Sequence, residues 1–217
     1  MTGFPDSPRL VKGGIIVVDP VTAAVQRVIP LQYNPETLSR TLQIQSSTGE
    51  GGDRSEALRL KGPAVETLKL DAEIDATDRL ETSDPVVVQS GLFPQLAALE
   101  MLLYPTVAVL TANDAMASSG RLEILPMEAP LTLFVWSANR VVPVRITDFS
   151  VTEEAFDTQL NPIRAKVSIG MRVLSVADLG FGHRGGGIYL AYQRAKEQLA
   201  TKAPGGSTGD LGIGAIP

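Results

Sequence analysis

Apolar and polar residues alternate most regularly between Pro130 and Ser175, where three extended runs are joined by two turns. The first run, 131–136, is largely apolar on both faces, so both faces require cover. The second run is apolar at most alternate positions of 142–151, and the third, 165–174, alternates apolar with polar residues. Because successive side chains of a strand point to opposite faces, this pattern predicts an antiparallel meander with one buried face.

Shorter extended runs precede this meander and predict four more strands. They span 12–19, 25–33, 38–44 and 65–75. We expect the first two to pair as a hairpin, and the chain then bends at Asn34-Pro35, because proline fixes its own φ and disfavours the helical region for the residue before it. The last run has an apolar face opposite a face that carries three acidic residues: Asp71, Glu73 and Asp75.

Helical spacing occurs in two segments. Leucines recur every three or four residues over 94–103 and Pro105 follows them, which predicts one internal helix. The residues before it, 77–89, read as an acidic connector. A second amphipathic helix is expected over 188–199, after a glycine-rich linker at 180–187. The small, polar residues 111–120 are expected to form a loop.

These elements predict a mainly β protein of the α+β class, built from packed antiparallel sheets with one internal helix and a C-terminal helix. Residues 1–179 are expected to form the β domain, 180–202 the linker and C-terminal helix, and 203–217 a flexible tail. A chain of 217 residues can bury a sizeable core.

Charge and composition narrow the classes of partner. The net charge of -5 argues against a nucleic-acid partner, and the lack of cysteine excludes disulfides, thiolate metal sites and a cysteine nucleophile. The apolar segment 91–112 is long enough to cross a bilayer, but two prolines interrupt it and Glu100 would lie near the bilayer centre, so we expect no membrane insertion. The N-terminus lacks a signal-peptide pattern, and we expect a cytoplasmic protein.

Reactive side chains do not combine into a recognisable site. The acidic strand, with Asp78 just beyond it, lacks the turn and glycine of a calcium loop, so a solvated strand face or an acidic inner surface of an assembly is the simpler interpretation. His183 is the only histidine and lies in the glycine linker. Glu153 and Glu154 are adjacent on a strand and point to opposite faces. We therefore expect no catalytic residues, cofactor or metal.

Several stretches resemble the tube-domain protein of contractile injection systems, which are phage-tail-like machines. They include residues 32–39, 68–78, 133–174 and 189–193. Within these stretches the motif residues are Asn34, Pro35, Glu36, Thr37, Trp136, Thr152, Glu153, Glu154, Phe156, Asn161, Pro162 and Arg164. Candidate lumen or interface residues are Asp71, Glu73, Asp75, Asp78, Tyr189 and Tyr192.

This resemblance implies a tail-tube-like split barrel that forms a sixfold ring. The ring would be an adaptor between the spike or hub of the baseplate and the inner tube. The implied partners are further copies of the chain, the hub, the tube protein and other baseplate subunits. Many relatives carry a LysM module after this region, which these 217 residues do not show. Two alternatives are a carbohydrate- or cell-wall-binding β-sandwich and a metal enzyme that uses the acidic strand.

Overall fold

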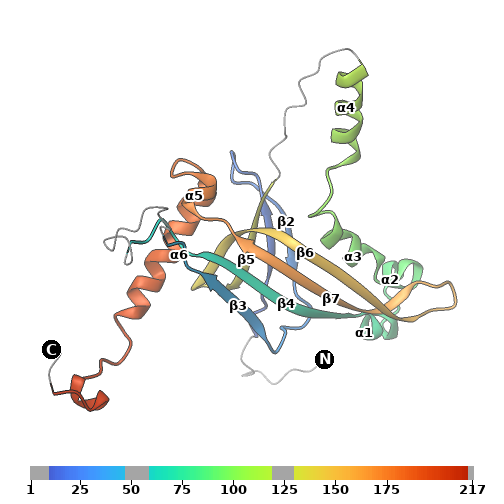
Figure 1. Ribbon diagram of the computed structural model, residues 1–217. Coiled ribbons are helices and arrows are strands. Elements are labelled where there is room, and N and C mark those ends of the chain that lie inside the picture. The colour runs from blue at the N-terminus through green and yellow to red at the C-terminus, as the bar shows by residue number, and fades with distance from the viewer. Residues whose placement is uncertain (1–9, 47–58, 119–129, 215–217) are drawn as a thin grey trace.

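The computed structural model describes residues 10–46, 59–118 and 130–214. Its strands form one seven-stranded antiparallel sheet in the order β2-β1-β5-β6-β7-β4-β3 (Figure 1). The strands are β1 Gly14–Val18, β2 Val25–Pro30, β3 Leu38–Gln43, β4 Val65–Asp75, β5 Leu131–Ser137, β6 Arg140–Phe156 and β7 Pro162–Val173. The mainly β class is confirmed. The described strands belong to one open sheet rather than to two packed sheets, and β2 and β3 are its edges.

The predicted meander is the centre of this sheet. β5, β6 and β7 pair in sequence, and the predicted hairpin of β1 and β2 joins them through β1, which pairs with β5. β6 is the longest strand: its pairing with β5 ends at Val144, whereas its pairing with β7 continues to Phe156. The far half of β6 therefore has a described partner strand on one side only.

Helices account for the main differences from the sequence prediction. They are α1 Thr77–Glu81, α2 Pro85–Ser90, α3 Phe93–Glu100, α4 Val107–Ser118, α5 Val176–Leu179 and α6 Arg184–Ala200, followed by the 3-10 helix Thr208–Leu211. The prediction of a single internal helix was wrong, because the described residues between β4 and β5 form four helices. The acidic connector forms α1 and α2, and much of the expected loop 111–120 belongs to α4.

Local capping explains two of these helices. The Asp84 carboxylate accepts a hydrogen bond from the backbone N–H of Val86 at 3.0 Å, and Pro85 stands at the first position of α2, where its missing N–H costs nothing. The C-terminal helix begins at Arg184 because the His183 ring accepts from the N–H of Gly185 at 3.0 Å. The prediction of a glycine linker over 180–187 was therefore wrong beyond His183, since residues 184–187 form the first turn of α6.

The main core lies on one face of the sheet. Val167 and Ile169 of β7 are fully buried there, with Val87 of α2 and Leu96 of α3 over one end and Tyr192 of α6 at the other. Figure 1 shows the corresponding arrangement, with α1–α3 beside the β6–β7 turn and α5 and α6 at the opposite end of the sheet.

A smaller apolar cluster lies on the opposite face of β1 and β5. It contains Val18, Leu131 and Leu133, against which Ile188 of α6 packs. The prediction that both faces of the 131–136 run require cover is therefore confirmed. No helix among the described residues is long and apolar enough to cross a membrane.

Candidate functional site

The acidic residues of β4 lie in register with basic residues of β7. Glu73 pairs with Lys166 and Asp75 with Arg164 across the antiparallel ladder. Because directly paired residues of neighbouring strands share a face, all four side chains project from the same side of the sheet. Asp71, two positions earlier on this side of β4, pairs with Ser168. We call the side of the sheet that carries these residues the charge-paired face.

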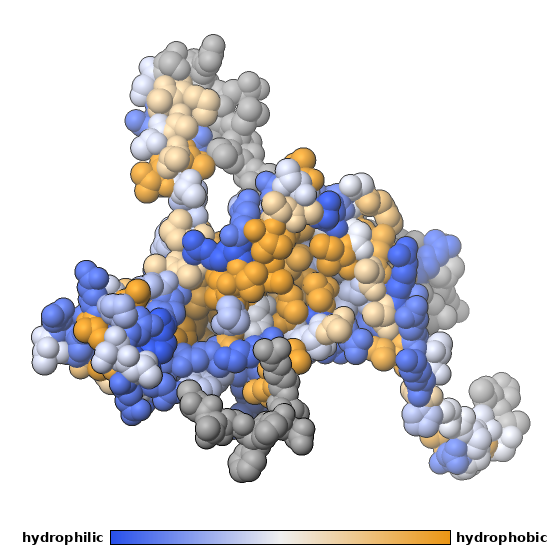
Figure 2. Space-filling view, turned by 180° about the vertical axis from the view of Figure 1, so that it is seen from behind, coloured by the Kyte–Doolittle hydropathy of each residue, from blue (hydrophilic) through white to orange (hydrophobic). Residues whose placement is uncertain are grey.

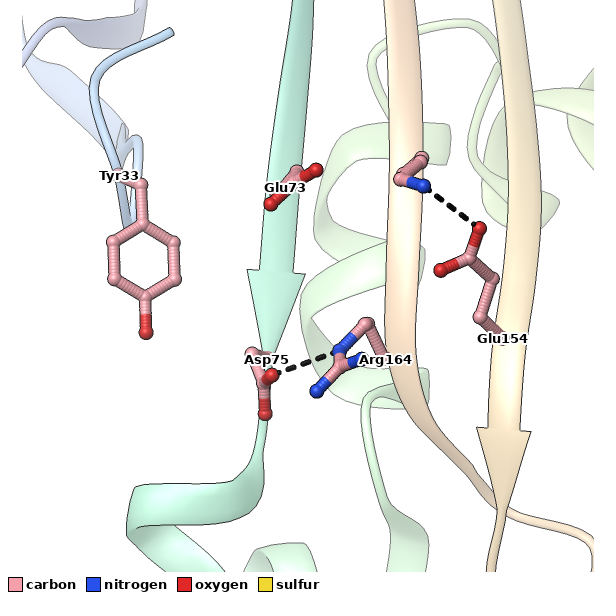
Figure 3. A pocket seen from close by; sticks show the side chains of 6 residues that line it. Tyr33, Glu73, Asp75, Glu154 and Arg164 are labelled. Carbon is pink, nitrogen blue, oxygen red and sulfur yellow. Dashed lines mark hydrogen bonds and ion pairs between the residues drawn. The ribbon is translucent and has the colours of Figure 1, made fainter.

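Two ion pairs cross this face. Arg164 Nε donates to Asp75 Oδ2 at 2.9 Å, and Lys166 Nζ lies 3.0 Å from Glu154 Oε1 on β6. Figure 3 shows these side chains around an open pocket that Tyr33 and Glu73 also line. Acidic and basic side chains therefore lie together on this part of the face, which modifies the expectation of an acidic inner surface. Asp71 and Glu73 are exposed and Asp75 is half-buried, but Arg164 and Lys166 of β7 lie opposite Asp75 and Glu73.

Hydrogen bonds favour the ionised form of Asp75 at the end of β4. The Thr77 hydroxyl and backbone N–H both donate to Asp75, and together with the Arg164 guanidinium they hold the pKa of Asp75 below its ordinary value. Asp75 in turn raises the pKa of Arg164. Within the described residues, no group of three or more His, Asp or Glu side chains is placed to hold a metal ion. The arrangement presents fixed opposite charges to solvent, which suits a hydrated contact surface.

The motif residues at the β6–β7 turn have a structural role. Asp157 Oδ1 accepts from the backbone N–H of Asn161 at 2.8 Å, and Asn161 Nδ2 donates to Asp157 Oδ2 at 2.8 Å. The Pro162 carbonyl accepts from the N–H of Leu92 at 2.8 Å, at the start of α3. These bonds attach the turn to the helical end of the molecule, so Asn161 and Pro162 position α3 rather than bind a ligand.

The motif near the N-terminus forms a crossing between the two edges of the sheet. Asn34 accepts from the N–H of Gly13 at 2.9 Å and donates to the carbonyl of Val11 at 2.8 Å, beside β1. Gln32, two residues earlier, bonds to the backbone of Asp75 at the end of β4. The crossing therefore links the β1 side of the sheet to the β4 side. Glu36 and Thr37 in the same segment are exposed.

No protein-family model matches this chain, and no curated protein matches its sequence. Among solved structures, the chain is similar to one described as the tail of an empty GTA particle, computed with helical refinement in C6 symmetry. The match covers 75% of this chain and 90% of that chain, at 10% sequence identity and a TM-score of 0.30.

The two tyrosines proposed for the lumen or an interface lie inside the molecule instead. Tyr189 and Tyr192 are buried between α6 and the sheet, where burial raises the pKa of Tyr189. The Tyr192 hydroxyl donates to Glu66 at 3.0 Å, and Lys196 Nζ lies 3.1 Å from the same carboxylate. Their interface role is therefore wrong at these positions, because α6 uses them to bind its own sheet.

Glu66 is the residue that the sequence analysis missed. It occupies an apolar-face position of β4 and is only 3% exposed. A buried carboxylate is costly unless it is paired, and here Tyr192, Lys196 and the more distant Arg40 surround it. A charged residue at an otherwise apolar position of the β4 alternation was the sequence signal that could have identified Glu66.

The remaining candidates are dispersed. Trp136 stacks on Phe134 with ring centres 6.0 Å apart and packs against the core. Thr152, Glu153 and Phe156 are exposed along the far half of β6, and Asp78 is exposed on α1, away from the acidic row of β4. The structure brings together Glu73, Asp75, Glu154, Arg164 and Lys166 on the charge-paired face.

Proposed function

We propose that this chain is a structural subunit of a phage-tail-like contractile injection particle, in which copies form a ring that joins the baseplate hub to the inner tube. The particle type, the adaptor position and the sixfold copy number come from the resemblance of the sequence motifs. The role is one of assembly, without turnover of a substrate.

The observation that carries this proposal is the pair of exposed edges on one open sheet. β2 and β3 are exposed along almost their whole length. Val28 of β2 is 58% exposed and Leu42 of β3 is 48% exposed. Unpaired strand edges with apolar side chains favour pairing with another chain. An edge on each side allows a head-to-tail contact, which closes into a ring when the rotation between copies permits it.

The charge-paired face supports a place for the sheet within such a ring. Its side chains are polar and two ion pairs cross it, so it can remain hydrated while the edges are covered. We propose that this face lines the lumen. The variants Asp71→Lys and Glu73→Lys are expected to alter cargo loading or passage, and unchanged passage in both would remove this part of the proposal.

Exposed aromatic side chains do not favour the carbohydrate-binding alternative. A sugar-binding surface usually presents aromatic rings together. Among the residues that the structure describes, the exposed aromatic side chains belong to five separate segments of the chain: Tyr33, Phe93, Tyr104, Phe156 and Phe181. The assembly proposal is therefore the better supported of the two.

The first experiment locates the chain in particles. An affinity tag on the C-terminal tail, followed by mild purification from the native host and negative-stain electron microscopy, is expected to recover sheathed rods labelled at one end. Label along the whole rod would make the chain a bulk tube subunit. Small homogeneous particles without rods, from cells shown to make rods, would contradict the proposal.

A second experiment tests the edges themselves. Val28→Lys and Leu42→Lys place a charge on β2 and β3 and are expected to exclude the chain from particles. Val88→Lys is the matched control, because Val88 is 52% exposed on α2, away from both edges. Incorporation of the edge variants at the level of the control would show that the edges do not form the contact.

A further inference from the structure

Helix α4 is exposed although its sequence is mostly apolar. Asp114 is its only charged residue, and none of its residues is buried. Figure 1 shows α4 standing away from the sheet, beyond α3. Val107 is 75% exposed and Leu110 is 53% exposed. A helix of this composition is normally buried, and an isolated helix of this length is marginal in water. The surface of α4 therefore fits a protein partner.

The far half of β6 shows the complementary feature, an apolar surface that is incompletely covered. Ile146, Phe149 and Val151 belong to the side chains packed against the main core, yet each is only half-buried. Beyond Val144, no described strand pairs with β6 on the side of β5. Figure 2 shows apolar surface gathered over the middle of the body, between the helical end and α6.

We propose that α4 of one copy packs against the apolar row of β6 in the neighbouring copy of the ring. This inference rests on the proposed function. A head-to-tail ring requires each copy to offer one surface and to accept a different one. A projecting apolar helix and a half-covered apolar strand are such a pair. The three acceptor side chains, Ile146, Phe149 and Val151, are uncharged, which matches a helix with a single carboxylate.

The small area of the α4 contact indicates that it forms only in the assembled ring. A helix of 12 residues is about 18 Å long and about 10 Å wide. Its footprint is therefore smaller than the roughly 800 Å² per partner of a standard stable interface. The contact is too small to hold a free dimer and is made in the assembled ring, where the strand edges also pair.

Cysteine cross-linking tests this contact cleanly because the chain contains no cysteine. Two differently tagged copies are expressed together in the particle-producing host, one with Leu110→Cys and the other with Val151→Cys. After mild oxidation of purified particles, we expect a disulfide-linked dimer that carries both tags. The control pairs Leu110→Cys with Asp71→Cys on the charge-paired face, and its dimer yield is expected to be at least about tenfold lower, because disulfides require close Cβ atoms.

A photo-cross-linking amino acid at Leu110 provides a measurement that leaves β6 unchanged. Mass spectrometry of irradiated particles is expected to find Leu110 joined to a peptide from 146–156 of another copy. Particles that contain the chain but give dimers only at the control level, or a link within one copy, would overturn this contact and leave the proposed function standing. A chain that never enters particles would overturn both.

Discussion

The Gln32 side chain binds both backbone polar groups of Asp75, a residue 43 positions away. Its amide nitrogen donates to the Asp75 carbonyl at 2.7 Å, and its oxygen accepts from the Asp75 N–H at 3.0 Å. Because Gln32 follows the edge strand β2 and Asp75 ends β4, next to the opposite edge, this pair ties the two sides of the open sheet together. The side chain does here what a neighbouring strand would do.

Replacement of Gln32 by alanine should therefore destabilise the fold. Gln32→Ala leaves two part-buried backbone groups without their partner, and we expect the free energy of unfolding to fall by about 1–3 kcal/mol in urea denaturation. Thr37→Ala in the same crossing is the control, because Thr37 is exposed and its loss should change stability by no more than about 0.5 kcal/mol. Equal stability of the two variants would contradict the role of Gln32.

The buried carboxylate of Glu66 should be energetically coupled to Tyr192. In a double-mutant cycle of Glu66→Gln and Tyr192→Phe, we expect a coupling energy of about 0.5–3 kcal/mol from denaturation midpoints. Tyr192→Phe keeps the ring under Lys196, whose Nζ lies 4.1 Å from the ring centre, so the cycle isolates the hydroxyl. A cycle of Tyr192→Phe with exposed Glu197→Gln should be additive. Additivity in both cycles would mean that the hydroxyl does not stabilise α6.

Gly91 and Gly187 form a matched pair for substitution by alanine. Gly91 has φ +53°, and a Cβ there would lie 2.5 Å from the Pro162 carbonyl oxygen, so Gly91→Ala should cost at least about 2 kcal/mol of stability. A Cβ at Gly187 meets nothing within 4 Å in α6, and Gly187→Ala should stabilise by up to about 1 kcal/mol. Thermal unfolding of both variants checks the expected opposite signs.

Acid should weaken the β6–β7 turn through Asp157. Its hydrogen bonds, first from the Asn161 side chain and then from backbone N–H groups, lower the pKa of Asp157. A lowered pKa in the folded state contributes stability that is present above the ordinary value of about 3.9 and is lost as the pH falls through the folded-state value. Asp157→Asn should be less stable than the wild type at pH 6, and the difference should shrink at pH 3.

Urea titrations of both proteins at the two pH values measure this effect. Because other carboxylates also titrate, the relevant quantity is the difference between the proteins rather than the slope of either one. A difference that does not change between pH 6 and pH 3 would contradict the part assigned to the charge on Asp157.

Strand alternation made much of the sheet predictable. The bounds of β4 agree with the prediction at both ends, and the meander and the first hairpin are present. These elements were predictable because alternate residues of a strand lie on the same face of the sheet. The short helices were not predictable in this way. The run Val86-Val87-Val88 has the composition of a strand, and its helical state depends on the Asp84 cap.

The candidate site depended on contacts between distant residues, which a local pattern does not contain. The acidic row of β4 was visible, but the pairing of Asp75 with Arg164 and the position of Lys166 opposite Glu73 follow from the register of β4 against β7. The Tyr192 hydroxyl reaches Glu66 across 126 positions, so neither the burial of that carboxylate nor that of the tyrosine could be read from its neighbours.

The pairing of β1 with β5 has a consequence for synthesis of the chain. More than a hundred residues separate these strands, so the first hairpin leaves the ribosome long before its partner exists. At about 5–20 residues per second, the interval is on the order of ten seconds. Throughout that time Ile15 and Val17 lack the strand beside which they are finally buried. Nascent chains of this protein therefore pass through an aggregation-prone stage that a chaperone would shorten or shield.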